Sequence, residues 1–265
     1  MYYPIYLGEE SATIGGNVAT NAGGMRAVKY GVTRHFVLGL EAVLPTGEII
    51  ETGGKYVKVS TGYDLTQLIT GSEGILAVVT KAALKLIAYP KATTTLFVPF
   101  RNLGDGVKVV PILLESGAIS VTIEFLEKLG LTAMEDYTRI KVPINERVRD
   151  EAEAFLIIVV EGKSHEEAFK DAEFIGDICL EHGAIDILIP TTERAGQELL
   201  QLREKTYYSA RDAGATDLID IIVPRGEIPK FMEETREISR KYATVNGGWA
   251  CWRWKHSSSC NRARS

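Results

Sequence analysis

The stretch Ala12-Thr-Ile-Gly-Gly-Asn-Val-Ala-Thr-Asn-Ala-Gly-Gly24 says more about this chain than any other part of its sequence. It holds four glycines and two asparagines among mostly small side chains. Glycine tolerates positive φ and lets the backbone lie close to another group. We therefore expect a segment that packs its backbone against a bulky ligand.

Composition limits the class of protein. A chain of 265 residues with 45% hydrophobic content forms one large domain or two ordinary ones. A net charge of -5 with mixed signs offers no basic field for nucleic acid, and no apolar run reaches the length of a membrane span. The three cysteines lack zinc spacing, and the first residues do not resemble a signal peptide. These features predict a soluble, cytoplasmic protein.

The first third of the chain predicts short strands between turns. We expect strands at 37–44 and 48–52 joined by a turn at Pro45-Thr-Gly47, a short helix at 64–70, and one or two strands within 75–86. Pro90 then marks a boundary.

Beyond Pro90 the pattern alternates between strands and longer helices. Ser164 and Glu167 form a capping box, and Gly183 stands where a helix would end. The pattern predicts strands at 95–100, 119–126, 154–161, 185–189 and 218–223, and helices at 103–116, 164–183, 193–212 and 228–242. This order is typical of an α+β domain with helices on one face of a sheet.

A second glycine-containing segment, Gly71-Ser-Glu-Gly-Ile-Leu-Ala-Val-Val-Thr80, places a tight turn before an apolar strand. Together with the first segment it suits a dinucleotide, although glycine-rich turns also simply join strands. The chain has neither GxGxxG nor GxxxxGK[ST], which disfavours a Rossmann domain or a P-loop.

Taken in order, these motifs resemble the FAD-binding domain of the vanillyl-alcohol oxidase and p-cresol methylhydroxylase superfamily, within its glycolate oxidase and D-lactate dehydrogenase branch. The resemblance rests on residues 12–17, 21–24, 30–31, 37–44, Lys58, 62–65 and 71–74. It continues through Arg203, Asp220 and Val223-Pro-Arg225. It implies the C-terminal part of a PCMH-type FAD-binding domain over residues 1–91, followed by an α+β, ferredoxin-like FAD-oxidase C-terminal domain over residues 92–248.

The resemblance implies an FAD enzyme that oxidises a small D-2-hydroxy acid of the D-lactate or glycolate type by hydride transfer to the flavin. The residues that would line FAD are Thr13, Ile14, Gly15, Gly16, Asn17, Thr20, Asn21, Ala22, Gly23, Glu73, Gly74, Ile75, Leu76, Ala77, Val78 and Val79. Two of them depart from the family pattern. Ile75 lacks a hydroxyl, and the Ala77 methyl is expected to crowd the backbone's approach to the cofactor.

Arg203 would hold the substrate carboxylate, as the family uses an arginine here. From spacing alone, the alternative is a solvated helix arginine paired with Glu198 or Glu204. The four histidines are scattered, so we expect no metal site.

The last residues fit neither pattern. The family has a Gly-His-Ala-Gly-Asp-Gly-Asn-x-His motif where this chain has Trp249-Ala-Cys-Trp-Arg-Trp-Lys-His-Ser-Ser258. One set of codons for these residues, TGG GCA TGC TGG AGA TGG AAA CAT TCA TCC, encodes Gly-His-Ala-Gly-Asp-Gly-Asn-Ile-His when read from the second base. We therefore expect residues 249–265 to be a frameshifted, disordered tail.

The glycine-rich pyrophosphate loop of the family is also not found in this chain, so we expect a truncated copy that is inactive by itself. Three interpretations stay open: an enzyme, a non-catalytic fragment or subunit that binds a complementary chain, and a truncated gene product without its own activity. The electron acceptor is unknown. Association with a membrane surface, another subunit or a second copy of the chain also stays open.

Overall fold

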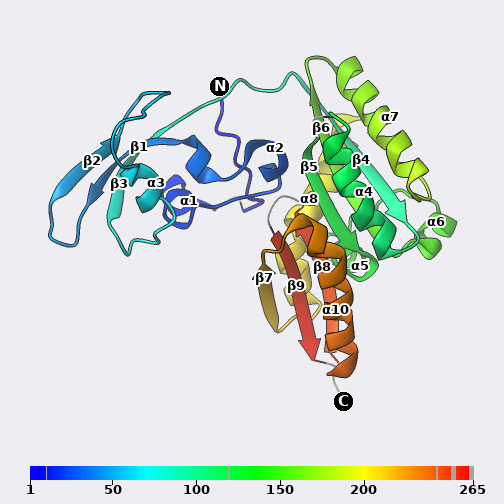
Figure 1. Ribbon diagram of the computed structural model, residues 1–265. Coiled ribbons are helices and arrows are strands. Elements are labelled where there is room, and N and C mark those ends of the chain that lie inside the picture. The colour runs from blue at the N-terminus through cyan, green and yellow to red at the C-terminus, as the bar shows by residue number, and fades with distance from the viewer. Residues whose placement is uncertain (10, 119, 243, 252–254, 263–265) are drawn as a thin grey trace. The chain divides into compact units, whose positions relative to one another are not determined.

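The chain divides between Tyr89 and Pro90 into two units, each with its own sheet (Figure 1). The structure is a computed structural model that describes residues 1–9, 11–118, 120–242, 244–251 and 255–262. Each unit is described by itself below.

The first unit contains a three-stranded antiparallel sheet in the order β2-β1-β3. The predicted hairpin is confirmed, because β1 (Val37–Val43) and β2 (Ile49–Gly53) pair across a turn in which Gly47 takes a φ of 87°. The other elements are α1 (Ile14–Thr20), α2 (Ala27–Tyr30), η1 (Thr33–Phe36), α3 (Leu65–Ile69) and β3 (Val78–Leu84). The core of this unit is a cluster of Val18, Val37, Leu40, Ala42, Ile69 and Ala77.

The second unit begins with a ferredoxin-like arrangement. Its elements are β4 (Ala92–Phe100), α4 (Leu103–Glu115), β5 (Ser120–Glu127), β6 (Ala154–Gly162) and α7 (His165–Glu181). The strands lie in the order β4-β6-β5, and the chain after α7 returns along the free edge of β4. This β-α-β-β-α-β course confirms the α+β expectation.

Residues 185–189 do not form the continuous strand that was predicted. Only isolated bridges join this segment to β4, at Phe97–Leu188 and Phe100–Ala184. Phe97 and Leu188 exchange both main-chain hydrogen bonds, but Pro99, the next residue on β4 that would donate on this edge, has no N–H. The proline therefore interrupts the ladder.

The sheet continues past β5 to the order β4-β6-β5-β8-β9-β7, with all pairs antiparallel. The predicted helix at 193–212 is divided at Lys205 into two helices, and two other helices, α5 and α6, were not predicted. The remaining elements are α5 (Lys128–Thr138), α6 (Glu146–Glu151), α8 (Glu193–Glu204), α9 (Thr206–Asp212), β7 (Asp217–Ile221), η2 (Arg225–Glu227), α10 (Ile228–Lys241), β8 (Thr244–Cys251) and β9 (Lys255–Arg262). Residues 249–251 and 255–262, which were expected to be disordered, lie in β8 and β9, and the out-of-frame origin of this tail stays a prediction.

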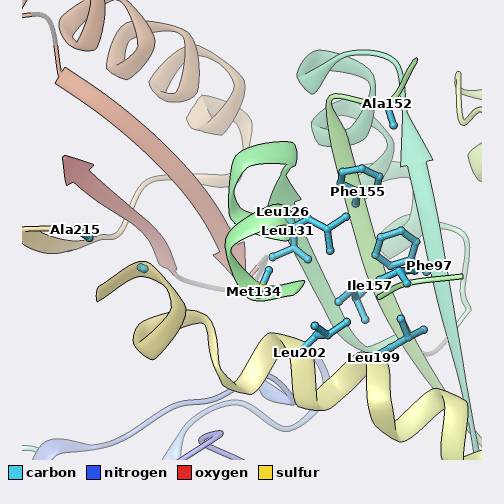
Figure 2. Packing of buried hydrophobic residues seen from close by; sticks show 12 residues of the cluster. Phe97, Leu126, Leu131, Met134, Ala152, Phe155, Ile157, Leu199, Leu202 and Ala215 are labelled. Atoms are coloured by element: carbon cyan, nitrogen blue, oxygen red, sulfur yellow. The ribbon is translucent and has the colours of Figure 1, made fainter. Parts of the chain in front are cut away.

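Helices cover both faces of the β4-β6-β5 part, so the expectation of helices on one face was wrong. All eight residues of β5 are buried, as in a strand that is covered on both sides. Phe97 and Phe155 stack 5.2 Å apart on the face that meets α5 and α8 (Figure 2). Phe100 and Phe125 lie on the opposite face, next to Gly106 of α4.

Candidate functional site

The first glycine-rich segment forms a helix, where the sequence suggested an irregular loop. Thr13 caps α1, because its Oγ1 accepts a hydrogen bond from Gly16 N–H at 3.0 Å. Gly15 and Gly16 are helical, and the only positive φ within residues 12–24 belongs to Asn21, at 50°. The expected positive φ at these glycines was therefore wrong: the cap starts a helix, and asparagine ends it.

The glycines of this segment differ in how much space surrounds them. A Cβ on Gly24 would overlap the Tyr6 carbonyl oxygen, and one on Gly23 would lie 2.9 Å from Val32 Cγ1. A Cβ on Gly15 would meet nothing within 4 Å. Glycine inside a helix costs about 0.5–1 kcal/mol relative to alanine. Nothing in the fold requires glycine at 15, and its exposed backbone leaves room for a ligand to approach.

The second glycine-containing segment docks onto the C-terminal end of α1. Gly71 N–H donates to Val18 O and Glu73 N–H donates to Ala19 O, both at 2.9 Å. Gly71 and Glu73 take positive φ values of 86° and 52°. These bonds satisfy helix-end carbonyls, so the fold itself brings the two segments together.

The residues expected to line FAD differ in exposure. Those with exposed surface are Thr13, Ile14, Gly15, Gly16, Thr20, Glu73, Gly74, Ile75, Leu76 and Val78, while Asn21, Ala22, Gly23 and Val79 are half-buried and Asn17 and Ala77 are buried. A hollow of about 460 Å³ adjoins the second segment and is lined by Val43, Leu44, Pro45, Gly74, Ala77 and Val78.

Ala77 belongs to the core cluster of the first unit and is only 3% exposed, so its methyl group packs inward and does not crowd the backbone's approach to a ligand. Ile75 is 80% exposed. Asn17 lies beside Tyr3, whose hydroxyl is 2.8 Å from Thr33 Oγ1. Burial raises the pKa of the Tyr3 hydroxyl, while the Thr33 and Asn17 side chains oppose that rise.

Arg34 is a residue of this region that sequence reasoning missed. Its main-chain N–H donates to Asn21 Oδ1 at 2.9 Å and its Nη2 donates to Thr70 O at 3.1 Å. It therefore contacts the end of the first segment and the residue before the second. No local motif marks it, because both partners are distant in sequence.

In the second unit, Arg203 is tied to the sheet. Its Nε donates to Glu124 Oε2 at 2.7 Å, and its Nη1 donates to Thr206 Oγ1 at 3.2 Å. The side chain of Glu124 is fully buried and that of Arg203 is 15% exposed. The alternative that Arg203 pairs with Glu198 on the helix surface was wrong, because Glu198 pairs with Arg194. Glu124 was not expected from the sequence.

The side chains of Asp220 and Arg225 lie outside the described residues. Within the part of the chain that the structure describes, no group of three His, Cys, Asp or Glu side chains is arranged to hold a metal ion. Among the same residues, no helix is both long enough and apolar enough to span a membrane.

Two family models match the chain. Residues 89–258 match the C-terminal domain of FAD linked oxidases, and residues 1–53 match an FAD binding domain. The chain is 37% identical over 239 residues to a D-lactate dehydrogenase of Anaerostipes hadrus, covering 90% of this chain and 50% of the relative. It is 39% identical over 232 residues to the glycolate oxidase subunit GlcD of Bacillus subtilis, covering 87% and 48%.

An uncharacterised FAD-linked oxidoreductase of Mycobacterium tuberculosis is 44% identical over 237 residues, covering 89% of this chain and 51% of the relative. The chain thus spans about half the length of the curated relatives it matches. Among solved structures, 4-ethylphenol oxidase from Gulosibacter chungangensis gives a TM-score of 0.71 at 16% identity, covering 98% of this chain and 57% of that one. p-Cresol methylhydroxylase gives 0.64 at 17% identity, covering 90% and 55%. These two likenesses concern the fold alone.

Proposed function

This chain belongs to the FAD-linked oxidase family, and from that premise we propose that it takes part in oxidising a small D-2-hydroxy acid of the D-lactate or glycolate type. FAD is the cofactor of this family, and the chemistry it supplies when bound is acceptance of a hydride. The observation that carries the proposal is the meeting of the two glycine-containing segments at the C-terminal end of α1, a helix whose first turn has the open backbone of Gly15.

The first unit would supply one wall of the cofactor site. Gly15 and Gly16 present exposed helical backbone, and Gly74 turns with a φ of 80° and space around its Cα. Gly15 and Gly74 allow a flat or charged group to approach main-chain atoms without meeting a side chain, whereas Thr13 Oγ1 lies close to Gly16. The lining residues proposed here are those at 13–17, 20–23 and 73–79.

Arg203 would bind the substrate carboxylate. Glu124 and Thr206 use its Nε and Nη1, while its Nη2 makes no hydrogen bond within the described residues. A guanidinium held along one edge presents its other N–H groups at a defined angle, which suits a carboxylate.

The test is the flavin content of the purified chain, followed by anaerobic addition of D-lactate. Against the expectation that the truncated copy is inactive by itself, the enzyme interpretation predicts flavin absorbance that bleaches with D-lactate and not with L-lactate. Arg203→Lys keeps the charge but loses the planar fork, so it should retain flavin and need more D-lactate for the same bleaching. A colourless preparation that fails to bind added FAD would refute the proposal for this chain.

A second candidate is a subunit that binds a complementary chain. The first unit exposes apolar side chains near the second segment, among them Ile75 at 80%, Ile49 at 68% and Val78 at 62%. Exposed apolar groups of this kind favour association. Co-expression with the N-terminal half of a related FAD domain should then restore flavin binding that the chain lacks alone. Failure of the two chains to co-purify would count against this candidate.

The third candidate is a truncated gene product whose tail is read out of frame. The nucleotide sequence decides this point. Codons for residues 249–258 that encode the glycine- and histidine-containing motif when shifted by one base would support it, and codons that do not would reject it.

A further inference from the structure

Arg34 occupies the junction of the two glycine-containing segments. It is the second residue of η1, and its main-chain N–H reaches Asn21 Oδ1, at the end of α1. Its Nη2 reaches the carbonyl of Thr70, directly before the second segment. A single residue therefore bonds to the first segment and to the residue that precedes the second.

Neighbouring side chains hold Arg34 in this position. Gln67 Nε2 donates to the Arg34 carbonyl at 2.9 Å. A Cβ on Gly71 would lie 2.8 Å from Asn21 Cβ and 3.4 Å from Arg34 Nη2, and this glycine also takes a φ of 86°. Glycine at 71 thus allows the second segment to approach both Asn21 and the guanidinium.

The charge of Arg34 is not neutralised locally. The side chain is half-buried, its Nε is buried without a hydrogen-bond partner, and no carboxylate within the described residues forms an ion pair with it. A cation in such a place is costly unless an anion or an essential hydrogen bond offsets it. Here the bond to the Thr70 carbonyl offsets part of that cost.

We propose that Arg34 is a positioning residue that sets the spacing of the two segments and thereby the affinity for FAD. The inference rests on the proposed function, in which these segments line the cofactor. Arg34 acts through the segments: it aligns the Asn21 end of α1 with Thr70, and the main-chain bonds of Gly71 and Glu73 to α1 follow from that alignment.

The test compares Arg34→Met, which keeps length but loses charge and donors, with Arg34→Lys, which can still donate to the Thr70 carbonyl. The control is Arg101→Met, the same substitution at an exposed arginine of the second unit, which removes its 2.9 Å bond to Glu151. Hydrogen exchange measures the amides of Gly71 and Glu73, and quenching of flavin fluorescence measures the FAD dissociation constant.

We expect Arg34→Met to speed exchange at both amides and to raise the FAD dissociation constant about tenfold or more, as for loss of a charge-assisted bond. Arg34→Lys should fall between Arg34→Met and the unchanged protein, and Arg101→Met should leave both readouts near those of the unchanged protein. Unchanged exchange in Arg34→Met overturns the positioning role, and faster exchange with an unchanged dissociation constant overturns its link to FAD. An unsubstituted chain that binds no FAD contradicts the proposed function instead, and the exchange data then decide the positioning role by themselves.

Discussion

Removing the carboxylate of Glu124 should destabilise the second unit more than any surface substitution. Glu124 has a fully buried side chain on β5, and its partner Arg203 on α8 is 15% exposed, with 2.7 Å between Oε2 and Nε. Glu124→Leu keeps approximate volume but leaves the guanidinium facing an apolar group. The pair joins the sheet to a helix, so its loss weakens contact between two layers.

The expected cost follows from burial. Breaking a buried pair by removing one partner costs about 3–5 kcal/mol. Arg203 keeps some solvent contact and a bond to Thr206, so we expect the lower end, about 3 kcal/mol. For a unit of this size that lowers the Tm by about 6–12 °C. Glu124→Leu combined with Arg203→Met should recover much of the loss, because no uncompensated charge remains.

Urea unfolding followed by far-UV circular dichroism measures these changes. The matched control is Glu198→Ala, which removes the exposed 3.0 Å pair with Arg194 on α8 and should cost only about 0.2–0.5 kcal/mol. A Glu124→Leu variant whose free energy of unfolding stays within about 1 kcal/mol of the unchanged protein would contradict a stabilising buried pair. A double variant as unstable as the sum of the two single ones would contradict direct coupling of the two side chains.

Three further predictions concern the fold. Gly24→Ala should destabilise the first unit by about 1–3 kcal/mol, because its Cβ would overlap the Tyr6 carbonyl. Gly15→Ala should instead stabilise the cofactor-free chain by about 0.5–1 kcal/mol, because its Cβ meets no other atom and alanine favours a helix. Thermal melts measure both changes, and equal effects of the two substitutions would contradict the difference in space at the two glycines. Phe155→Ala should cost about 3–5 kcal/mol in urea unfolding because Phe155 is fully buried, and a loss below about 1 kcal/mol would disprove tight packing there. Burial raises the pKa of the Cys179 thiol to about 12, so iodoacetamide at pH 8 should leave Cys179 unlabelled until the chain unfolds, and rapid labelling of the folded chain would contradict its burial.

Elements with strong local signals were predicted well. The long helix α7 begins where Ser164 Oγ accepts from Glu167 N–H at 3.2 Å, and Gly183 follows its end with a φ of 96°. The hairpin of β1 and β2 likewise follows from a turn and flanking apolar residues. In both cases the deciding residues lie within a few positions of one another.

Other elements depend on distant partners. Two adjacent glycines argue against a helix at 14–20, yet α1 forms because Thr13 caps it and the main chain of Gly71 and Glu73 satisfies its last carbonyls. The 185–189 segment has strand-like residues but meets an edge interrupted by Pro99. Whether these two segments form a helix or a strand therefore depends on tertiary contacts that the local sequence does not reveal.

In the candidate site too, features with a local sequence signal were predicted and features that depend on distant partners were not. Glycine and asparagine residues pointed to the two segments of the first unit, because residues with no or small side chains leave the main chain accessible to a ligand. The partner of Arg203 could not be found this way, because Glu124 lies 79 positions away in sequence, on strand β5. Arg34 was missed for a similar reason, as it is 36 positions from Thr70.

Residues 13–17, 20–23 and 73–79, in the two glycine-containing segments, are proposed to form one wall of an FAD site. Hydrogen exchange with and without saturating FAD, read by mass spectrometry, tests this claim directly. We predict slower exchange in both segments together, while helix α7 in the second unit keeps its rates. Unchanged exchange in both segments at saturating FAD would contradict the claim.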